Sequence, residues 1–146
     1  MTGFNAGHSS FNYLTARRDV RVHSFDSGAH NYTLAMVSYL QRIFPGRLNF
    51  TLGDTRTSLF QYILPNETTT PLTCDMMLVD GEHSTEAALS DIRNFALLAS
   101  QPYNVMIVDD IQKPPVAAAW KIALKSRIVQ EIYLCAYDRQ YAIAVV

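Results

Sequence analysis

The sequence has no excess of charge of either sign. Its 12 lysines and arginines and 13 aspartates and glutamates give a formal net charge of −1. This balance excludes the strongly basic surface that nucleic acids or anionic membranes attract. The sequence also lacks a signal peptide and any apolar run near the roughly 20 residues that cross a bilayer. We therefore expect a cytoplasmic protein with no nucleic-acid partner and no membrane partner.

Cysteine is scarce as well. Cys74 and Cys135 both lie in apolar stretches, and no C-x-x-C pair is present. This excludes a disulfide framework and a zinc module, and it predicts two buried free thiols. Repeats and long linkers are missing too, while 49% of the 146 residues are hydrophobic. These features predict a single globular domain over residues 1–146.

What the sequence does contain is a regular alternation of strand-like and helix-like segments. This alternation predicts an α/β fold, with a mostly parallel sheet, helices on both of its faces and an antiparallel hairpin at the C-terminus. The predicted strands are residues 20–26, 47–52, 75–79, 103–108, 128–136 and 141–146, and the predicted helices are residues 7–18, 31–43, 57–64, 84–100 and 114–125.

Some helix ends carry recognisable signals. Asn31 and Ser84 are suited to cap a helix, and Pro114 or Pro115 suits a first helical turn. Two connections also stand out. Residues 65–71 have a proline at each end and predict a loop, and the short connection at 138–139 has the length of a hairpin turn. Elsewhere we expect Trp120 to face the core, Asp91 to be structural, and His8 and His30 to be incidental to catalysis.

Acidic residues follow all four predicted parallel strands. The strands end in Asp26, Gly53-Asp54, Asp80-Gly81 and Asp109-Asp110. One such aspartate is an ordinary turn or cap residue. Ligands of parallel sheets bind at the carboxyl ends of the strands, so all of these carboxylates would meet in one crevice. Their repulsion would be offset by a ribose diol, an amine or a divalent ion, and oxygen ligands favour Mg²⁺, Ca²⁺ or Mn²⁺ over zinc.

A series of short motifs accompanies these strand ends. They are Gly3-Phe4-Asn5-Ala6-Gly7-His8-Ser9, Ser24-Phe25-Asp26, Phe44-Pro45-Gly46-Arg47, Gly53-Asp54, Val79-Asp80-Gly81-Glu82-His83 and Val108-Asp109-Asp110-Ile111. In this order and spacing, the set resembles class I S-adenosylmethionine (SAM)-dependent methyltransferases. The subgroup with DGxH after the fourth strand and DD after the fifth, which contains metal-dependent O-methyltransferases, is the most similar.

This resemblance implies a SAM site along the first three strand ends. Asp26 would accept hydrogen bonds from the ribose hydroxyls. Asp54, with Gly53, would lie beside the adenine, although a helix cap explains Asp54 equally well. The turn nearest the N-terminus would let the backbone approach the methionine part of SAM. Its residues are Gly3, Phe4, Asn5, Ala6 and Gly7.

The resemblance also implies a metal site and a reaction. Asp80, Asp109 and Asp110 would hold a divalent ion, expected to be Mg²⁺. Asp80 and His83 would be the catalytic residues, with His83 a general base or a metal ligand; a hydrogen-bonded residue at the start of a helix is the alternative for His83. The implied function is metal-assisted O-methylation of a small hydroxylated or sugar-containing acceptor.

The start of the sequence departs from the family pattern. Members have an apolar strand ending in an acidic residue two positions before Gly3, and Met1 and Thr2 supply neither. We therefore expect an N-terminally truncated methyltransferase domain whose first strand is absent. The sheet would then close directly between the strands ending at Asp26 and Asp80, or another copy would donate a strand, giving a homo-oligomer through exposed strand edges, or the sequence is a fragment.

Two other functions compete with methyl transfer. A degenerate domain that keeps the fold and acts as a non-catalytic interaction module would fit the incomplete glycine motif. A nucleotide- or NAD-binding protein of similar architecture ranks last, because the turn at Gly3 to Gly7 lacks the G-x-G-x-x-G pattern and no Walker lysine follows it.

Overall fold

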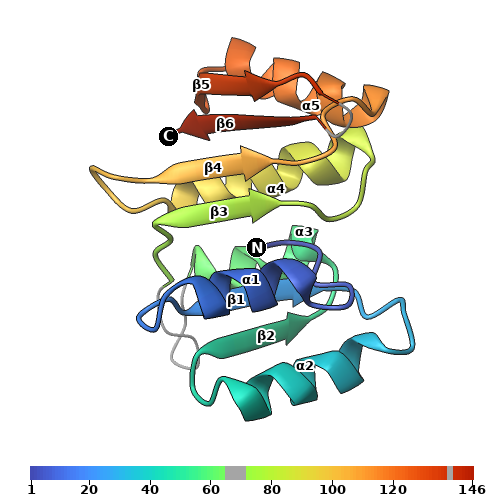
Figure 1. Ribbon diagram of the computed structural model, residues 1–146. Coiled ribbons are helices and arrows are strands. Elements are labelled where there is room, and N and C mark those ends of the chain that lie inside the picture. Colours follow the sequence, from blue (N-terminus) through green and yellow to red (C-terminus); the bar gives the residue numbers. More distant parts are fainter. Residues whose placement is uncertain (65–71, 138–139) are drawn as a thin grey trace.

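The computed structural model describes residues 1–64, 72–137 and 140–146, in which helices and strands alternate along the chain (Figure 1). The predicted loop at 65–71 and the hairpin connection at 138–139 lie outside the described residues. The elements are α1 (His8–Ala16), β1 (Val22–Asp26), α2 (Thr33–Ile43), β2 (Leu48–Leu52), α3 (Thr55–Ser58), the 3-10 helix η1 (Phe60–Tyr62), β3 (Met76–Val79), α4 (Thr85–Leu98), β4 (Val105–Val108), α5 (Pro114–Lys125), β5 (Gln130–Cys135) and β6 (Tyr141–Val145).

The alternation of helices and strands confirms the predicted α/β class. The strands form two sheets. β1 and β2 pair in parallel, and the second sheet has the order β3-β4-β6-β5. Within it β3 and β4 are parallel, whereas β6 is antiparallel to both β4 and β5. The last two strands therefore make the predicted antiparallel hairpin. The carboxyl ends of β1, β2, β3 and β4 all point to the same side (Figure 1).

Residues 1–3 lie between the two sheets. The N–H of Thr2 donates to the carbonyl of Leu78 on β3 (2.9 Å), and the N–H of Gly3 donates to the carbonyl of Phe25 on β1 (2.9 Å). The Phe25 N–H in turn donates to the carbonyl of Met1 (2.9 Å), so Thr2 forms a single parallel bridge with β1. In the described residues β1 and β3 do not pair with each other. Of the three alternatives for the start of the sheet, direct closure between these two strands is therefore wrong.

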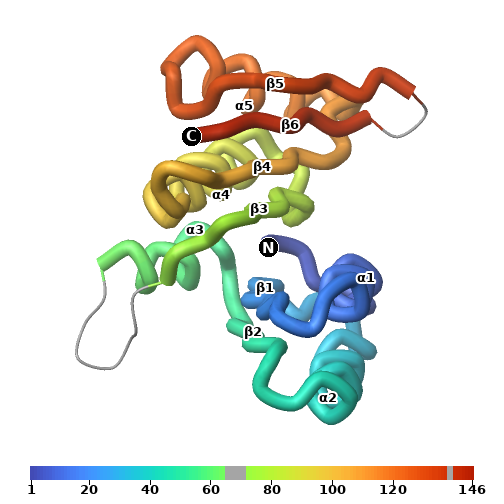
Figure 2. The backbone as a smooth tube through the Cα atoms, turned by 60° about the vertical axis from the view of Figure 1, so that its left-hand side comes forward, coloured from blue at the N-terminus to red at the C-terminus, as the bar shows by residue number. Residues whose placement is uncertain are grey.

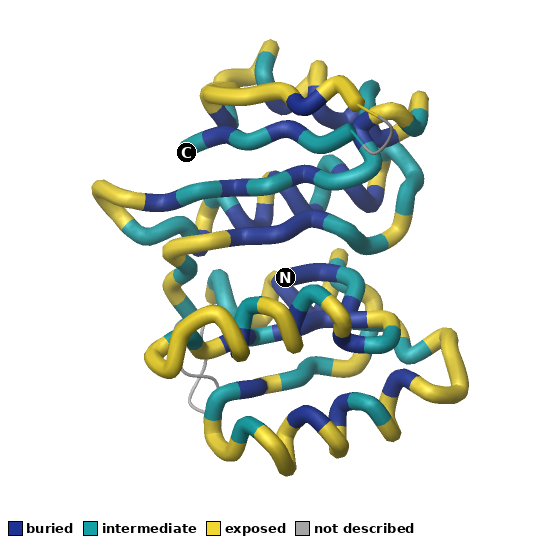
Figure 3. Tube along the Cα trace, viewed as in Figure 1, coloured by how far each residue is buried: buried dark blue, intermediate teal, exposed yellow. Residues whose placement is uncertain are grey.

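Two apolar clusters stabilise the two faces. Helices α1 and α2 cover one face of β1 and β2, and α3, α4 and α5 lie on the opposite side of the molecule (Figure 2). The larger cluster packs α4 and α5 against the sheet and includes Phe95, Met106 and Trp120. The smaller cluster includes Leu14 and Leu40 on the other side. Most residues of β1 and β3 are buried, whereas β5 is largely exposed (Figure 3).

Local signals explain most helix starts. The Ser84 side chain accepts from the N–H of Ala87 and caps α4, and Pro114 and Pro115 begin α5, as predicted. The cap predicted at Asn31 is wrong. α2 begins at Thr33, whose N–H donates to the carbonyl of His30 (3.1 Å), so a backbone turn replaces the side-chain cap.

Several single-residue predictions can be checked directly. Trp120 faces the core, as predicted, and its Nε1 donates to Glu131 (2.8 Å). Both cysteines are free thiols, but only Cys135 is buried, whereas Cys74 is partly exposed. None of the helices within the described ranges is long and apolar enough to cross a membrane.

Candidate active site

A cavity of about 550 Å³ opens at the carboxyl ends of the parallel strands. Its size is that of a small-molecule site. Eight residues predicted to bind cofactor or metal line it together, although they come from five segments of the chain. They are Gly3, Asn5, Asp26, Gly53, Asp54, Asp80, His83 and Asp110.

The turn at Gly3 is shaped by the protein's own backbone. Gly3 has a φ of +75°, and a Cβ placed on it would lie 1.8 Å from the carbonyl oxygen of Asp80. Only glycine allows this approach, which brings the turn against the loop after β3. Of the other residues predicted here, Asn5 lines the cavity, and Phe4 is buried against Phe50 in the smaller cluster. Gly7 precedes α1 and, with Ala6, is not among the lining residues.

The carboxylate of Asp26 ties two loops together. Its Oδ2 accepts from the backbone N–H of Asn5 (2.9 Å), and its Oδ1 accepts from the N–H of Gly28 (2.7 Å). Carboxylate oxygens accept more than one hydrogen bond, so these contacts leave acceptor capacity toward the cavity. The Tyr32 hydroxyl donates to the Asn5 side chain (2.6 Å). The Tyr32 ring stacks on the ring of His30, another lining residue.

Asp54 is both a helix cap and a lining residue. Its Oδ1 accepts from the N–H of Arg56 (2.9 Å), which starts α3 at Thr55. The Arg56 guanidinium also donates to both carboxylate oxygens and lowers the pKa of Asp54. The short helix predicted at 57–64 is divided into α3 and η1. Because Asp54 is the cap, α3 begins two residues earlier than predicted.

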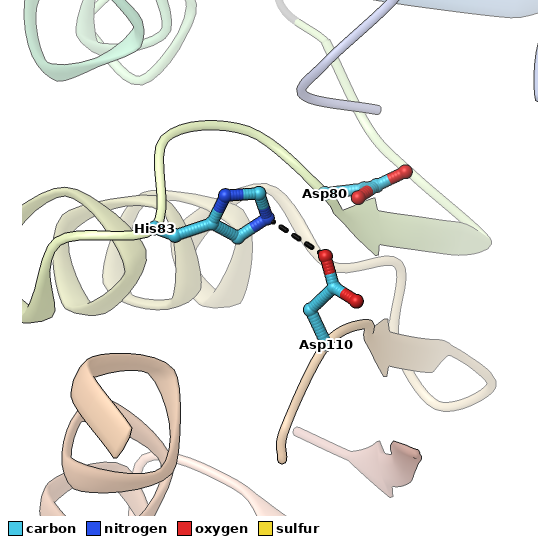
Figure 4. Close-up of side chains that lie close together, drawn as sticks. All are labelled: Asp80, His83 and Asp110. Carbon is cyan, nitrogen blue, oxygen red and sulfur yellow. Dashed lines mark ion pairs between the residues drawn. The ribbon is translucent and has the colours of Figure 1, made fainter. Parts of the chain in front are cut away.

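Asp80, His83 and Asp110 form a compact group of possible metal ligands. One donor atom from each lies within 4.8 Å of the others. His83 and Asp110 face each other, with Nε2 2.9 Å from Oδ2 (Figure 4). Asp109 lies outside this group, and its Oδ1 accepts from the N–H of Asp110 (2.8 Å). The structure thus brings together Asp80 and Asp110, two of the three predicted aspartate ligands, with His83, which was predicted as a general base or a metal ligand.

Asp110 has a backbone conformation that aims its side chain at this group. Its φ is +57°, in the left-handed region that aspartate tolerates better than most residues. Its carbonyl accepts from the N–H of Lys113 (2.9 Å), which closes the turn before α5.

Lys113 is the residue that sequence reasoning missed. Its Nζ is 2.7 Å from Asp110 Oδ2, and it lies 3.2 and 3.3 Å from the two ring nitrogens of His83. Partial burial opposes ionisation of Asp110, but hydrogen bonds from Lys113 and Gln112 prevail and lower its pKa. The only sequence signal was a lysine three residues after the second aspartate of the DD motif.

Two titratable groups outside the cavity lining, the buried Asp91 and the partly buried His23, have shifted pKa values. Burial raises the pKa of Asp91, which is completely buried on α4, to about 6, against the opposing effect of Thr55 and Thr2. Burial lowers the pKa of His23 on β1 to about 4. Its ring stacks on Phe25, and its Nε2 is 2.8 Å from the Thr51 hydroxyl. The interior position of Asp91 agrees with its predicted structural role.

The site residues suit the groups that the resemblance implies. Asp26 presents acceptor oxygens to a cavity large enough for a nucleoside-sized ligand. Two carboxylates and an imidazole at close range are ligands that divalent ions accept. A parallel sheet with a glycine turn, a carboxylate after β1 and this group after β3 and β4 defines the SAM-dependent methyltransferase class.

Comparison with known proteins agrees with this class. A family model described as a methyltransferase domain matches residues 1–111. The chain therefore belongs to this methyltransferase family. No curated protein matches the sequence.

Solved structures share the fold at low sequence identity. CalS11, a TDP-rhamnose 3'-O-methyltransferase of calicheamicin biosynthesis, superposes with a TM-score of 0.70 at 13% identity over 97% of this chain. The O-methyltransferase NovP gives 0.60 at 19% over 89%. NcsB1, an O-methyltransferase solved with SAM and 2-hydroxy-5-methyl naphthoic acid, gives 0.63 at 15% over 99%. The chain spans 68%, 61% and 47% of these three proteins, respectively.

Proposed function

We propose that this domain binds SAM in the cavity and transfers its methyl group to a hydroxyl oxygen of a small acceptor, with help from a divalent ion. The observation that carries the proposal is that Asp26 and the group of Asp80, His83 and Asp110 line one cavity. One end therefore suits a ribose, and the other suits a hydroxyl and a cation. The acceptor class is a small hydroxylated or sugar-containing molecule.

The cofactor end would be held by loop backbone and by two carboxylates. Asp26 would accept from the ribose diol while the N–H groups of Asn5 and Gly28 fix its orientation. Asp54, held by Arg56, would lie at the adenine side of the cavity. SAM would supply a methyl carbon bound to a sulfonium, which is already a good leaving group.

The reactive end would position the acceptor and manage one proton. Asp80, His83 and Asp110 would be the residues that face a divalent ion, which when bound lowers the pKa of a hydroxyl and orients its oxygen. Transfer would form a bond between the methyl carbon and the acceptor oxygen and break the bond from carbon to the SAM sulfur, on which the electron pair would stay. In the alternative role of His83, with its imidazole as general base and not as a ligand, it would take the hydroxyl proton, and Asp110 at 2.9 Å would stabilise the resulting cation.

Cofactor binding is tested by titration calorimetry with SAM, with and without Mg²⁺. We expect SAM binding by the wild-type chain and at least a tenfold loss in an Asp26→Ala variant, because the ribose loses its acceptor. Asp19→Asn is the matched control, since Asp19 pairs with Arg17 on the exposed surface. Absence of SAM binding would contradict the proposal and favour a non-catalytic interaction module.

Metal assistance is tested by following methyl transfer to a panel of diphenols and nucleoside diphosphate sugars. We expect Asp80→Asn to lower Mg²⁺-stimulated transfer at least 100-fold while SAM affinity stays within threefold of wild type. The same separation is expected for Asp109→Asn if Asp109 also contacts the ion. Equal loss of transfer and SAM affinity in Asp80→Asn would instead assign Asp80 to the cofactor or to the fold.

A further inference from the structure

The acidic end of the cavity already has a cation of its own. Lys113 lies with its Nζ 2.7 Å from Asp110 Oδ2, the same oxygen that faces His83 Nε2 at 2.9 Å. We propose that Lys113 is a tethered counter-cation that holds Asp110 when no divalent ion is bound and that the ion must displace. This inference rests on the proposed metal site and deepens it, because it makes Lys113 the residue that sets metal affinity.

The geometry makes the two cations alternatives. A magnesium ion binds a carboxylate oxygen at about 2.0–2.1 Å, whereas the Lys113 ammonium hydrogen bonds to the same oxygen at 2.7 Å. Both on one oxygen would stand within roughly 4 Å of each other, where like charges repel strongly at the low effective dielectric of a partly enclosed site. Lys113 also contacts both ring nitrogens of His83, so it covers a second ligand of the group.

The main chain around Lys113 is fixed, but its side chain is free to leave. The turn from Asp110 to Lys113 is closed by a backbone hydrogen bond, and Pro114 and Pro115 follow directly as the first turn of α5. The Lys113 side chain is 42% exposed, whereas that of Asp110 is 13% exposed. Rotation of the four-carbon stem would therefore carry the ammonium into solvent without moving Asp110.

Metal binding provides the first test. We expect Lys113→Gln to bind Mn²⁺ at least tenfold more tightly than the wild-type chain, measured by the loss of the free Mn²⁺ signal in electron paramagnetic resonance. Lys113→Arg keeps the charge and should stay within threefold of wild type. Lys121→Gln is the matched control, because Lys121 lies exposed on α5, the helix that Lys113 precedes.

The outcomes separate this inference from the proposed function. If wild type and Lys113→Gln bind Mn²⁺ equally, the metal site stands and the counter-cation role is overturned. If neither binds Mn²⁺ at millimolar concentration, the proposed metal site fails, and the displacement of Lys113 fails with it. If Lys113→Gln and Lys113→Arg both bind Mn²⁺ more tightly than wild type, the charge of Lys113 is not what opposes the ion, and the counter-cation role is overturned.

A second test uses no variant. The chain has three lysines, Lys113, Lys121 and Lys125, so ¹⁵N-lysine labelling gives three side-chain ammonium signals. We expect the Lys113 signal to be protected from water exchange in the metal-free protein and to lose this protection on addition of Mg²⁺, while the other two stay unchanged. A Lys113 signal that is unaffected at a Mg²⁺ concentration that saturates the site would overturn the proposal.

Discussion

Asp91 and His23 lie outside the cavity lining on α4 and β1, and their burial acts on the two residues in opposite directions. Burial favours the neutral acid at Asp91 and the neutral imidazole at His23. Each shift links folding to pH, because a group with different pKa values in the folded and unfolded chains changes the number of bound protons on unfolding. The two contributions oppose each other between pH 4 and pH 6.

For Asp91 the favourable range is acidic. The folded pKa of about 6 lies above the ordinary value of 3.8, so the stabilisation is complete below pH 3.8 and is lost as the pH rises through 6. The loss is about 3 kcal/mol. We expect Asp91→Asn to become more stable relative to wild type by this order between pH 4 and pH 7, measured by urea unfolding. A stability difference that does not change with pH would contradict the assigned burial effect.

For His23 the sign is reversed. The folded pKa of about 4 lies below the ordinary value of 6.5, so its stabilisation is present above pH 6.5 and is lost as the pH falls through 4. The same unfolding series on His23→Gln should show the variant gaining on wild type as the pH falls, by about 3 kcal/mol. His30, which is solvent-exposed, offers the control variant His30→Gln. An equal gain in both variants would mean that burial of His23 is not the cause.

Part of the site could be predicted residue by residue, and part could not. Aspartates at the ends of parallel strands converge because the strands do, so Asp26, Asp80 and Asp110 were found from their positions alone. Asp109 lies outside the group of possible ligands, and its carboxylate accepts from the N–H of Asp110, which sequence spacing does not reveal. Lys113 enters the site through the turn that follows, so only the folded loop shows its partners.

At the scale of elements, one arginine connects α1 to β2. Arg47 precedes β2, and its guanidinium donates to the carbonyls of Val20 (2.9 Å), Leu14 (2.8 Å) and Arg17 (2.6 Å). The last carbonyls of a helix have no partner within it, so this side chain satisfies part of the C-terminal end of α1. It also lies over the ring of Phe44, which follows α2.

We therefore expect Arg47→Met to lower the free energy of unfolding by about 2–4 kcal/mol, since hydrogen bonds to charged groups contribute about 1.5–3 kcal/mol each and these are partly exposed. Arg47→Lys should lose less, because an ammonium keeps the charge but not the planar fork. Arg18→Met, on the exposed surface nearby, is the control for a lost positive charge. Thermal and urea unfolding would check this order of stabilities. Equal unfolding free energies for Arg47→Met and Arg18→Met would contradict the prediction.

The order and type of the main elements could be predicted, because apolar periodicity depends on which face is buried. Each predicted strand contains the observed one, and the central strands differ only by one or two residues at an end. The exceptions are local. α2 begins with a backbone turn and not with the predicted Asn31 cap. Asp54 caps α3, which therefore begins earlier than the periodicity indicated. Both depend on how a loop closes, which the apolar pattern does not record.

At the scale of the molecule, the two sheets meet only through residues 1–3 among the described strand contacts. The larger apolar cluster is built mainly from β3, β4, β6, α4 and α5 and includes Phe25 of β1, whereas the smaller one is built mainly from β1, β2, α1 and α2 and includes Leu78 of β3. Because buried apolar surface supplies most of the stability, the two parts should not open with equal ease.

Native-state hydrogen exchange would test this inequality. We expect the amides of β2 to exchange through an opening at least about 2 kcal/mol lower in free energy than those of Met77, Met106 and Ala144, which lie in the larger cluster. Addition of SAM should reduce this difference in opening free energy, because the proposed cofactor would contact loops from both parts. A single exchange free energy for all of these amides would show that the molecule opens as one unit.

The position of Trp120 determines what optical methods can detect. It is the only tryptophan in the sequence, it is 4% exposed, and its indole N–H is bonded to Glu131 on β5. Its fluorescence therefore reports first on the larger apolar cluster, in which α4 and α5 pack against the sheet. A melt followed by tryptophan emission would therefore monitor this cluster and not the cavity of the proposed SAM site, which Trp120 does not line. An emission change on adding SAM would show that binding alters the surroundings of Trp120.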